Sequence, residues 1–275
     1  MKYQSVEGAL PLGFQLGGYR IERILGDGGF GIAYLATIAE GGIKCAIKEF
    51  FPRDHAHRSG DSSVRVANPS MQDDFEYMRA MFAEEGRVLA SLSHPSFVRY
   101  IDYFDAMGTS YLVMSYESGF DLLHSIKNGR TMSEDDMLNF ILPLLGGLET
   151  LHAQGYIHRD IKPQNIFSGP DNHAVLIDFG AAILIDTQLS IPPDGIFSEH
   201  FAPIEQYEND GGMGPWTDVY AVAAVMFFML TGNKPPKATD RKLKQVPIVP
   251  LATSGIEGYS TATLAAIDQA LAQNP

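Results

Sequence analysis

Residues 158–165 read His158-Arg159-Asp160-Ile161-Lys162-Pro163-Gln164-Asn165, and Asp178-Phe179-Gly180 follows 13 residues later. Phosphoryl transfer requires a group that orients the acceptor hydroxyl, a cation beside the γ-phosphate and two oxygen ligands for Mg²⁺. Residue types suited to these tasks, in that order, are Asp160, Lys162, Asn165 and Asp178. Each short string can arise by chance, but their combination with a glycine-rich loop and a strand lysine upstream predicts a phosphoryl-transfer site.

The composition is that of an acidic globular protein. Of the 275 residues, 45% are hydrophobic and 19% are charged, which is typical of a folded chain with room for two small lobes. The formal net charge of −13 disfavours a general nucleic-acid or anionic-membrane surface, because such surfaces need a basic stripe. We therefore expect no nucleic-acid partner and no membrane partner.

Three further features predict a cytoplasmic location. The start, Met1-Lys2-Tyr3-Gln4, lacks the apolar run of a signal peptide. The longest apolar stretch, residues 219–230, is shorter than the roughly 18–20 residues of a membrane span. The single cysteine, Cys45, permits no intrachain disulfide, and its apolar neighbours favour a buried thiol over a reactive one.

The first half of the chain has the patterns of a β-rich lobe. Apolar and polar residues alternate over 19–25, 32–36 and 43–48, which predicts three antiparallel strands joined by tight turns. Residues 52–70 are expected to form a long loop or insertion, and residues 73–92 a helix. A pair of strands is expected next, over residues 97–104 and 110–116.

The second half has the patterns of a helical lobe. Helical spacing over 137–152 follows Ser133, a suitable N-cap, and the nearly all-apolar stretch 218–231 predicts a buried helix. We expect Asp218 to cap backbone near residues 158–165. The fold class expected is α+β with two lobes, residues 19–117 and 118–275, after an N-terminal extension over residues 1–18.

A glycine-rich loop lies between the first two expected strands, where Gly26-Asp27-Gly28-Gly29-Phe30-Gly31 fits the spacing G-x-G-x-x-G. Glycines let backbone N–H groups approach phosphates without interference from a Cβ. A dinucleotide-binding loop has the same spacing, but a helix would follow it, whereas residues 32–36 alternate like a strand. For this string alone, a hairpin without a ligand is the other alternative.

Cys45-Ala46-Ile47-Lys48 matches the strand pattern V-A-I-K, in which the lysine contacts the α- and β-phosphates. Taken alone, such a lysine is more often an edge charge that points to solvent. Beside a glycine-rich loop it needs a carboxylate partner, and two neighbours on the expected helix are available. We prefer Glu85 to Glu84, because Glu85 shares its helix face with Leu89 one turn later.

Together these motifs resemble those of the protein kinase superfamily, specifically the bacterial eukaryotic-like Ser/Thr protein kinases, over residues 19–275. The residues that carry the resemblance are Gly26, Gly28, Gly31, Ala46, Ile47, Lys48, Glu85, the stretches 158–165 and 178–180, Glu205 and Asp218. Lys162 resembles the Ser/Thr rather than the Tyr kinases. More loosely, the chain is similar to PpkA-type kinases associated with type VI secretion.

The resemblance implies a bilobal fold with ATP in the cleft, together with Mg²⁺ or with Mn²⁺ in its place. It implies that Met114 is the gatekeeper residue beside the nucleotide. The backbone of the hinge, Ser115, Tyr116 and Glu117, would pair with adenine. The adenine base would lie between the side chains of Ala33, Ala46 and Phe167. Asp160 would orient the substrate hydroxyl, Lys162 would neutralise the γ-phosphate, and Asn165 and Asp178 would hold the metal. The substrates implied are Ser and Thr hydroxyls of proteins, the chain itself included.

The resemblance also implies regulation by phosphorylation. Arg159 before Asp160 resembles kinases in which a phosphate on the activation segment pairs with this arginine. Thr187 and Ser190 are the expected acceptors, and Ser198 is expected to contact Asp160 and Lys162. Ala33 and Ile204 depart from the usual Val and Pro of the family. The chain ends before the family's final helix, so we expect a fragment of a longer protein.

Two other functions stay open at this point. A pseudokinase that binds nucleotide as a scaffold without transfer is the alternative from another class, although all six catalytic positions hold competent residues. A small-molecule kinase of the aminoglycoside type shares the later Asp and Asn, but usually lacks the full glycine loop and the Asp160-x-Lys162 arrangement. The expected function is ATP-dependent Ser/Thr phosphorylation in bacterial signalling.

Overall fold

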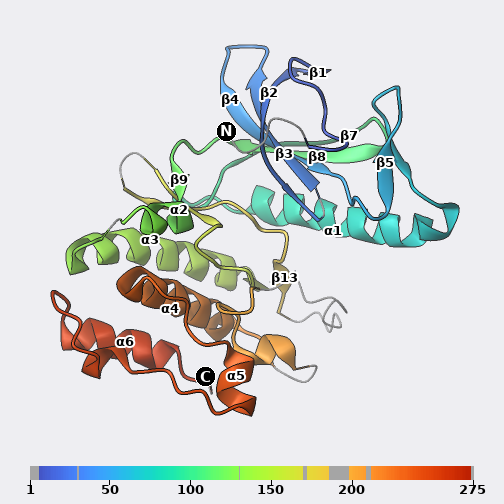
Figure 1. Cartoon of the computed structure of the whole chain (residues 1–275). Helices are drawn as coiled ribbons and strands as arrows, with labels where there is room; N and C mark the ends of the chain where they lie inside the picture. The colour runs from blue at the N-terminus through green and yellow to red at the C-terminus, as the bar shows by residue number, and fades with distance from the viewer. Residues whose placement is uncertain are drawn as a thin grey trace. The chain divides into compact units, whose positions relative to one another are not determined.

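A computed structural model describes residues 6–29, 31–129, 131–169, 172–185, 198–208 and 212–273. The chain divides into two compact units: residues 1–93 with 98–116 form the first, and residues 94–97 with 117–275 form the second. The first unit holds the large sheet and one long helix, and the second is mainly helical (Figure 1). This is the α+β composition that the sequence predicts.

A six-stranded antiparallel sheet is the frame of the first unit, with the strand order β1-β2-β3-β4-β8-β7. Its strands are β1 (Gln15–Leu16), β2 (Tyr19–Gly28), β3 (Gly31–Ile38), β4 (Lys44–Phe50), β7 (Tyr100–Ala106) and β8 (Thr109–Ser115). The three strands expected before residue 50 and the later strand pair are confirmed. That pair turns at Met107 and Gly108, whose φ angles are 52° and 75°, as a tight hairpin turn requires.

Side chains on β3 and β4 form the centre of this unit's core. Ile32, Tyr34, Ala36 and Ile47 are all fully buried. Cys45 is also buried, and its thiol donates a weak hydrogen bond to the carbonyl oxygen of Ala36 at 3.6 Å. Burial raises the pKa of this thiol to about 11, which confirms the expected inert cysteine.

Helix α1 (Gln72–Ser91) packs against β7 and β8 and confirms the expected helix (Figure 1). Its apolar residues face the sheet, where Phe82 lies 5.7 Å from the ring of Phe50. The segment expected to be a long loop or insertion, residues 52–70, contains short regular elements that the sequence did not indicate. That segment forms a hairpin of β5 (Ala56–Arg58) and β6 (Val64–Val66), followed by the 3₁₀ turn η1 (Pro69–Met71). Strands of three residues are too short to give a readable alternation.

Helices form most of the second unit. They are α2 (Leu122–Lys127), α3 (Glu134–Ala153), α4 (Pro215–Thr231), α5 (Ala238–Leu243) and α6 (Thr261–Ala270), with the 3₁₀ turns η2 (Ile204–Tyr207) and η3 (Leu251–Thr253). Ser133 caps α3 as expected, because its Oγ accepts the N–H of Asp136 at 3.2 Å. The largely buried α4 packs against α3 and α6.

Short strands connect these helices and carry the motif residues. They are β9 (Phe120–Asp121), β10 (Tyr156–Ile157), β11 (Ile166–Ser168), β12 (Ala174–Leu176) and β13 (Ile183–Leu184). β11 pairs with β9 and β12, and β10 pairs with β13. The stretch 158–165 therefore lies between β10 and β11, and residues 178–180 lie between β12 and β13.

The buried carboxylate of Asp218, in the first turn of α4, fixes the start of the stretch 158–165. Its Oδ2 accepts the backbone N–H of His158 at 2.8 Å, and its Oδ1 accepts that of Arg159 at 2.9 Å. Arg159 has a φ of 67°, in the left-handed region that non-glycine residues rarely adopt. The two hydrogen bonds hold this residue in place directly before Asp160, which confirms the expected capping role of Asp218.

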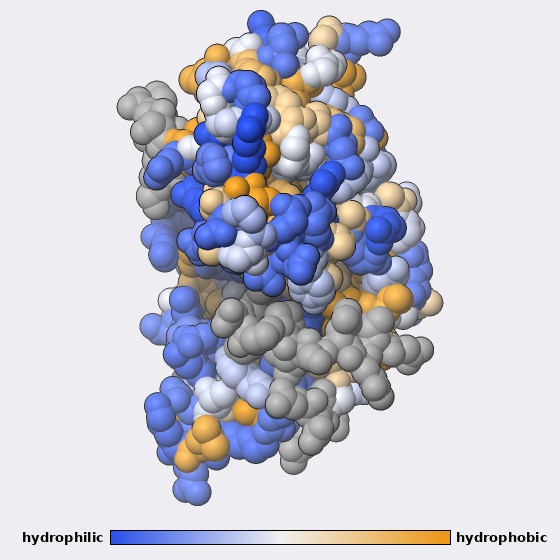
Figure 2. All heavy atoms as spheres, turned by 90° about the vertical axis from the view of Figure 1, so that its right-hand side faces the viewer, coloured by the Kyte–Doolittle hydropathy of each residue, from blue (hydrophilic) through white to orange (hydrophobic). Residues whose placement is uncertain are grey.

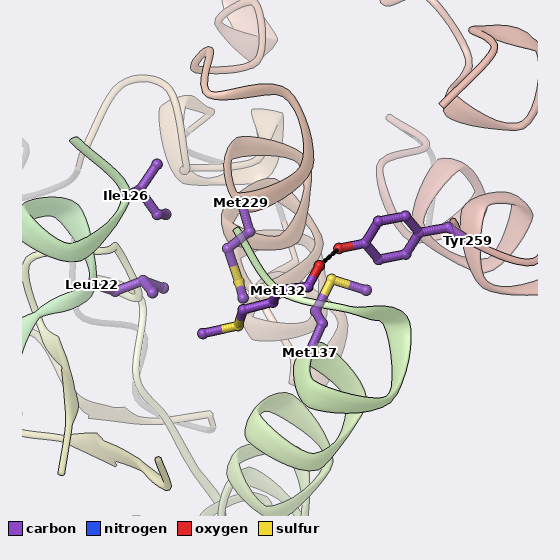
Figure 3. A pocket seen from close by; sticks show the side chains of 6 residues that line it. All are labelled: Leu122, Ile126, Met132, Met137, Met229 and Tyr259. Carbon is purple, nitrogen blue, oxygen red and sulfur yellow. Dashed lines mark hydrogen bonds between the residues drawn. The ribbon is translucent and has the colours of Figure 1, made fainter. Parts of the chain in front are cut away.

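Three methionines gather at a small pocket in the second unit (Figure 3). The lining residues are Leu122, Ile126, Met132, Met137, Met229 and Tyr259. The Tyr259 hydroxyl donates a hydrogen bond to the carbonyl oxygen of Met132 at 2.5 Å. None of these residues belongs to the phosphoryl-transfer motifs. Unbranched thioethers adapt to irregular gaps, and the lining residues Leu122, Met137 and Met229 come from α2, α3 and α4.

The face drawn in Figure 2 is mostly hydrophilic, with apolar side chains in separate small patches. Such scattered apolar residues are normal for a protein surface. Within the described parts of the chain, every helix is too short or too polar to cross a membrane.

We expect Asp218→Ala to lower the free energy of unfolding by about 3 kcal/mol, because two buried backbone N–H groups lose their charged acceptor. Asp74→Ala is the matched control, since Asp74 also lies in the first turn of a helix but is exposed. Its loss should stay below about 1 kcal/mol. Urea unfolding followed by circular dichroism measures both. Equal losses would contradict the anchoring role of Asp218.

Candidate active site

Lys48 and Glu85 form an ion pair in the first unit. The Nζ of Lys48, on β4, lies 2.8 Å from both Oε1 and Oε2 of Glu85, on α1. The Glu85 side chain is only 4% exposed, so its carboxylate is shielded from competing water. The neighbouring Glu84 pairs with Arg87 instead. The structure thus brings Lys48 to Glu85, the partner that the sequence favours.

The sheet places three predicted adenine contacts on the same face as Lys48. Ala33 pairs with Lys48 across β3 and β4, and Ala46 pairs with Met114 across β4 and β8. Directly paired residues point to the same face, as do residues two apart in one strand. Ala33, Ala46, Met114 and Lys48 therefore share one face, and the small side chains of the two alanines leave room beside the lysine.

The glycine-rich hairpin joins β2 to β3, with Gly28 paired to Gly31. A Cβ on Gly31 would meet the carbonyl oxygen of Glu49 at 2.3 Å, so only glycine permits this close approach of β3 to β4. At Gly26, Gly28 and Gly29 a Cβ would meet nothing within 4 Å. The hairpin therefore presents open backbone that a phosphate could approach. Phe30 lies outside the described residues.

The expected hinge residues Ser115, Tyr116 and Glu117 lie where the chain passes from the first unit into the second. Ser115 is tied to Arg99 by two hydrogen bonds: its N–H donates to the Arg99 carbonyl at 2.8 Å, and its Oγ accepts the Arg99 N–H at 3.0 Å. The Tyr116 hydroxyl accepts a hydrogen bond from Arg23 at 3.0 Å. Glu117 belongs to the second unit, as does Phe167 on β11.

Asp160 is the centre of a polar cluster in the second unit. The Nζ of Lys162 lies 2.6 Å from its Oδ2, and the Nδ2 of Asn165 donates to the same oxygen at 3.1 Å. The Oγ of Ser198 donates to Oδ1 at 3.0 Å. The expected contact of Ser198 with Asp160 is confirmed. The cluster gives the buried Asp160 carboxylate three donors and a fixed orientation.

Asp178 follows β12, and its Oδ1 accepts the N–H of Gly180 at 3.2 Å. The next residue, Phe179, is 1% exposed and packs edge-on against His158, with ring centroids 5.0 Å apart. Burial lowers the pKa of His158, against the raising effect of nearby carboxylates. The full burial of His158 and its packing against Phe179 agree with the expectation that it is structural.

Residues 158–165 are also tied to the segment that follows residue 180. The Nε of Arg159 donates to the carbonyl oxygen of Ala181 at 2.8 Å, and the Nε2 of Gln206 donates to the carbonyl of Arg159 at 2.9 Å. No pattern in the sequence singles out Gln206, whose one distinguishing mark is its place directly after Glu205. Thr187 and Ser190 lie outside the described residues.

Asn165 and Asp178 fit a magnesium site. The side-chain amide of Asn165 donates two hydrogen bonds to Asp160. Its Nδ2 donates to the backbone carbonyl oxygen of Asp160 at 2.9 Å and also to the Oδ2 of Asp160. This orientation leaves the amide oxygen as the atom offered to a cation. Magnesium prefers oxygen ligands and commonly takes only one or two from the protein, with waters and substrate phosphates completing the shell.

Comparison with known proteins places these motifs in a family. Residues 19–253 match the family described as the protein kinase domain. The Ser/Thr protein kinase B of Synechocystis sp. is 32% identical over 239 residues, which cover 82% of this chain and 38% of that protein. The Ser/Thr protein kinase PknJ of Mycobacterium tuberculosis is 30% identical over 279 residues, covering 97% of this chain and 44% of PknJ. The chain thus spans less than half the length of these relatives.

A solved structure agrees with this assignment. The structure titled PpkA-294 apo form has a TM-score of 0.86 and 32% sequence identity, and the match covers 97% of this chain and 94% of that chain. The fold is therefore the protein kinase fold, with a β-rich N-lobe and a helical C-lobe. The chain belongs to the protein kinase family, and it resembles the bacterial eukaryotic-like Ser/Thr kinases as its motifs predict.

Proposed function

We propose that this chain transfers the γ-phosphoryl group of ATP to Ser and Thr hydroxyls of proteins. The observation that carries the proposal is the Asp160 cluster, in which one carboxylate is held by Lys162, Asn165 and Ser198. The named Ser/Thr kinases among the relatives support the choice of acceptor. Protein kinases as a family use ATP with a divalent metal ion, here Mg²⁺ or, in its place, Mn²⁺.

Each residue has a distinct task in the proposed reaction. Asp160 orients the substrate hydroxyl and accepts its proton as the oxygen attacks the γ-phosphorus and the bond to the β-phosphate oxygen breaks. Lys162 offsets the negative charge on the transferred group. Ser198 keeps the second oxygen of Asp160 occupied, so that the carboxylate cannot rotate freely. Asn165 and Asp178 hold the metal, which neutralises phosphate charge when bound.

The remaining predicted residues bind the nucleotide. Lys48, fixed by Glu85, contacts the α- and β-phosphates, and the backbone of Gly26, Gly28, Gly29 and Gly31 covers the phosphates. The adenine contacts are Ala33, Ala46, Met114, Ser115, Tyr116, Glu117 and Phe167. In this proposal residues 19–117 and 118–275 act as the two lobes and residues 1–18 as an extension of the first. The two compact units of the chain support this division.

Partners and location follow from the same proposal. The substrates are proteins, the chain itself included, and the acidic net charge of −13 gives no reason to expect nucleic acid or a membrane surface. We propose a cytoplasmic bacterial signalling role, and the likeness to the PpkA structure supports a PpkA-type kinase.

Incubation with Mg²⁺ and labelled ATP should place label on the chain or on a generic basic protein. Lys48→Met should reduce transfer at least about hundredfold, because a cation that stabilises the phosphates is lost. Lys44→Met is the matched control, since Lys44 is an exposed lysine on the same strand, and it should keep normal activity. Nucleotide binding by the unaltered chain without any transfer, under several metals and substrates, would support a pseudokinase instead.

The Glu85 carboxylate should matter and that of Glu84 should not. Glu85→Gln removes the charge that holds Lys48, and we expect kcat/KM for ATP to fall about ten- to hundredfold. Glu84→Gln alters an adjacent residue of the same helix whose partner is Arg87, so kcat/KM should change less than about twofold. Steady-state kinetics measures both variants. Similar losses in the two would remove Glu85 from the proposed machinery.

Autophosphorylation should modify the segment that includes Thr187 and Ser190. Mass spectrometry of the chain after incubation with Mg²⁺ and ATP should find phosphate on one of these residues. Asp160→Asn is the inactive control and should carry none, because its amide cannot accept the hydroxyl proton. Phosphate found only outside residues 181–200 would contradict the proposed acceptors.

A further inference from the structure

Two arginines in the segment after β4 each meet a carboxylate of the large sheet. The Nη2 of Arg53 lies 2.8 Å from Oδ2 of Asp27, and the Nη2 of Arg58 lies 2.6 Å from Oε2 of Glu49. We call residues 51–58 the arginine brace. Neither arginine belongs to the motifs assigned above, and both of their partners lie next to residues proposed to bind nucleotide.

The pair of Arg58 and Glu49 anchors the brace in the core of the first unit. Glu49 is fully buried, and its two oxygens also accept hydrogen bonds from the hydroxyls of Tyr34 at 2.7 Å and Tyr111 at 2.8 Å. Arg58 donates further to the backbone carbonyls of Gly8 and Ser62. A buried carboxylate is stable only with such a set of partners, so this end of the brace is rigid.

The pair of Arg53 and Asp27 is different, because it reaches the glycine-rich hairpin. Asp27 lies between Gly26 and Gly28, and the side chains of Arg53 and Asp27 are 34% and 28% exposed. The Nε and Nη2 of Arg53 are shielded from solvent, yet no acceptor among the described residues meets them with hydrogen-bond geometry. The contact is therefore an imperfectly directed charge pair, which a small movement of the hairpin can tighten.

Strand register shows from which side the brace acts. Asp27 pairs with Ile32 and Ile32 pairs with Glu49, so both carboxylates extend from one face of the sheet. Lys48, adjacent to Glu49 in the same strand, extends from the opposite face. The brace thus holds the hairpin and β4 from the face opposite to the proposed phosphate-binding lysine. On this geometry Arg53 acts through Asp27 rather than as a ligand of the nucleotide.

We propose that Arg53 is a positioning residue, which through Asp27 holds the glycine-rich hairpin in the conformation that receives nucleotide. The inference rests on the function proposed above. A hairpin rich in glycine loses much conformational freedom when it orders on a ligand, and a charge pair that already restrains the hairpin reduces that loss in advance. The pair should therefore affect nucleotide affinity, with little effect on the chemical step.

The test compares Arg53→Gln and Asp27→Asn with the unaltered chain. The KM for ATP and the Kd for ADP, the latter measured by calorimetry, should each rise about three- to tenfold, while kcat stays within about twofold. Arg65→Gln is the matched control. Arg65 also lies in the segment between β4 and α1, but its partner Asp61 is exposed, so both constants should be unchanged.

Combined variants show whether Arg53 and Asp27 affect nucleotide affinity through their mutual contact or whether each change weakens the hairpin independently. Adding Arg53→Gln to Asp27→Asn should cause little further loss, and the exchanged pair Asp27→Arg with Arg53→Asp should recover part of the ADP affinity. If circular dichroism shows that a single variant fails to fold, the ADP affinity of the exchanged pair tests the coupling between residues 27 and 53 instead. Unchanged ADP affinity in both single variants, or a loss confined to kcat, would overturn the inference alone. An unaltered chain that neither binds ADP nor transfers phosphate would overturn the proposed function and the inference with it.

Discussion

A single buried carboxylate, that of Asp218, fixes the backbone from which the proposed catalytic groups extend. It satisfies two N–H groups that burial would otherwise leave without an acceptor, and it holds Arg159 in a conformation that costs energy. Asp160 comes next in the chain, so the direction of its carboxylate depends on this constraint. Lys162, Asn165 and Ser198 then orient the carboxylate itself. A residue of a buried helix thus determines the geometry of the polar groups in the stretch 158–165.

The parts of the site that could be predicted from the sequence are those set by local spacing. Residues 158–165 and 178–180 place the residue types that phosphoryl transfer needs within short stretches, and together with the glycine-rich loop and Lys48 they predicted the chemistry. The choice of Glu85 over Glu84 was also accessible, because helical periodicity decides which of two adjacent residues shares a face with Leu89. Likewise, alternation over β2, β3 and β4 predicted the central strands, and Ser133 was recognisable as the N-cap of α3.

The parts that could not be predicted depend on partners distant in the chain. Nothing local indicates that Arg58 would meet Glu49, or that the polar segment after Pro52 would pair as β5 and β6. A buried charge looks like a surface charge until its partners are known, and three-residue strands carry too little pattern. Gln206 was missed for the same reason, since its only bond to the stretch 158–165 is made to a backbone carbonyl 47 positions away.

The single thiol of the chain gives it a practical property. Because Cys45 is enclosed within the sheet and is almost wholly protonated at neutral pH, maleimides and similar reagents should leave it untouched. A cysteine introduced on the exposed side of either unit would then be the sole target for a dye or a spin label. Pairs of such labels, one per unit, allow the separation of the two units to be followed in solution without first removing a native residue.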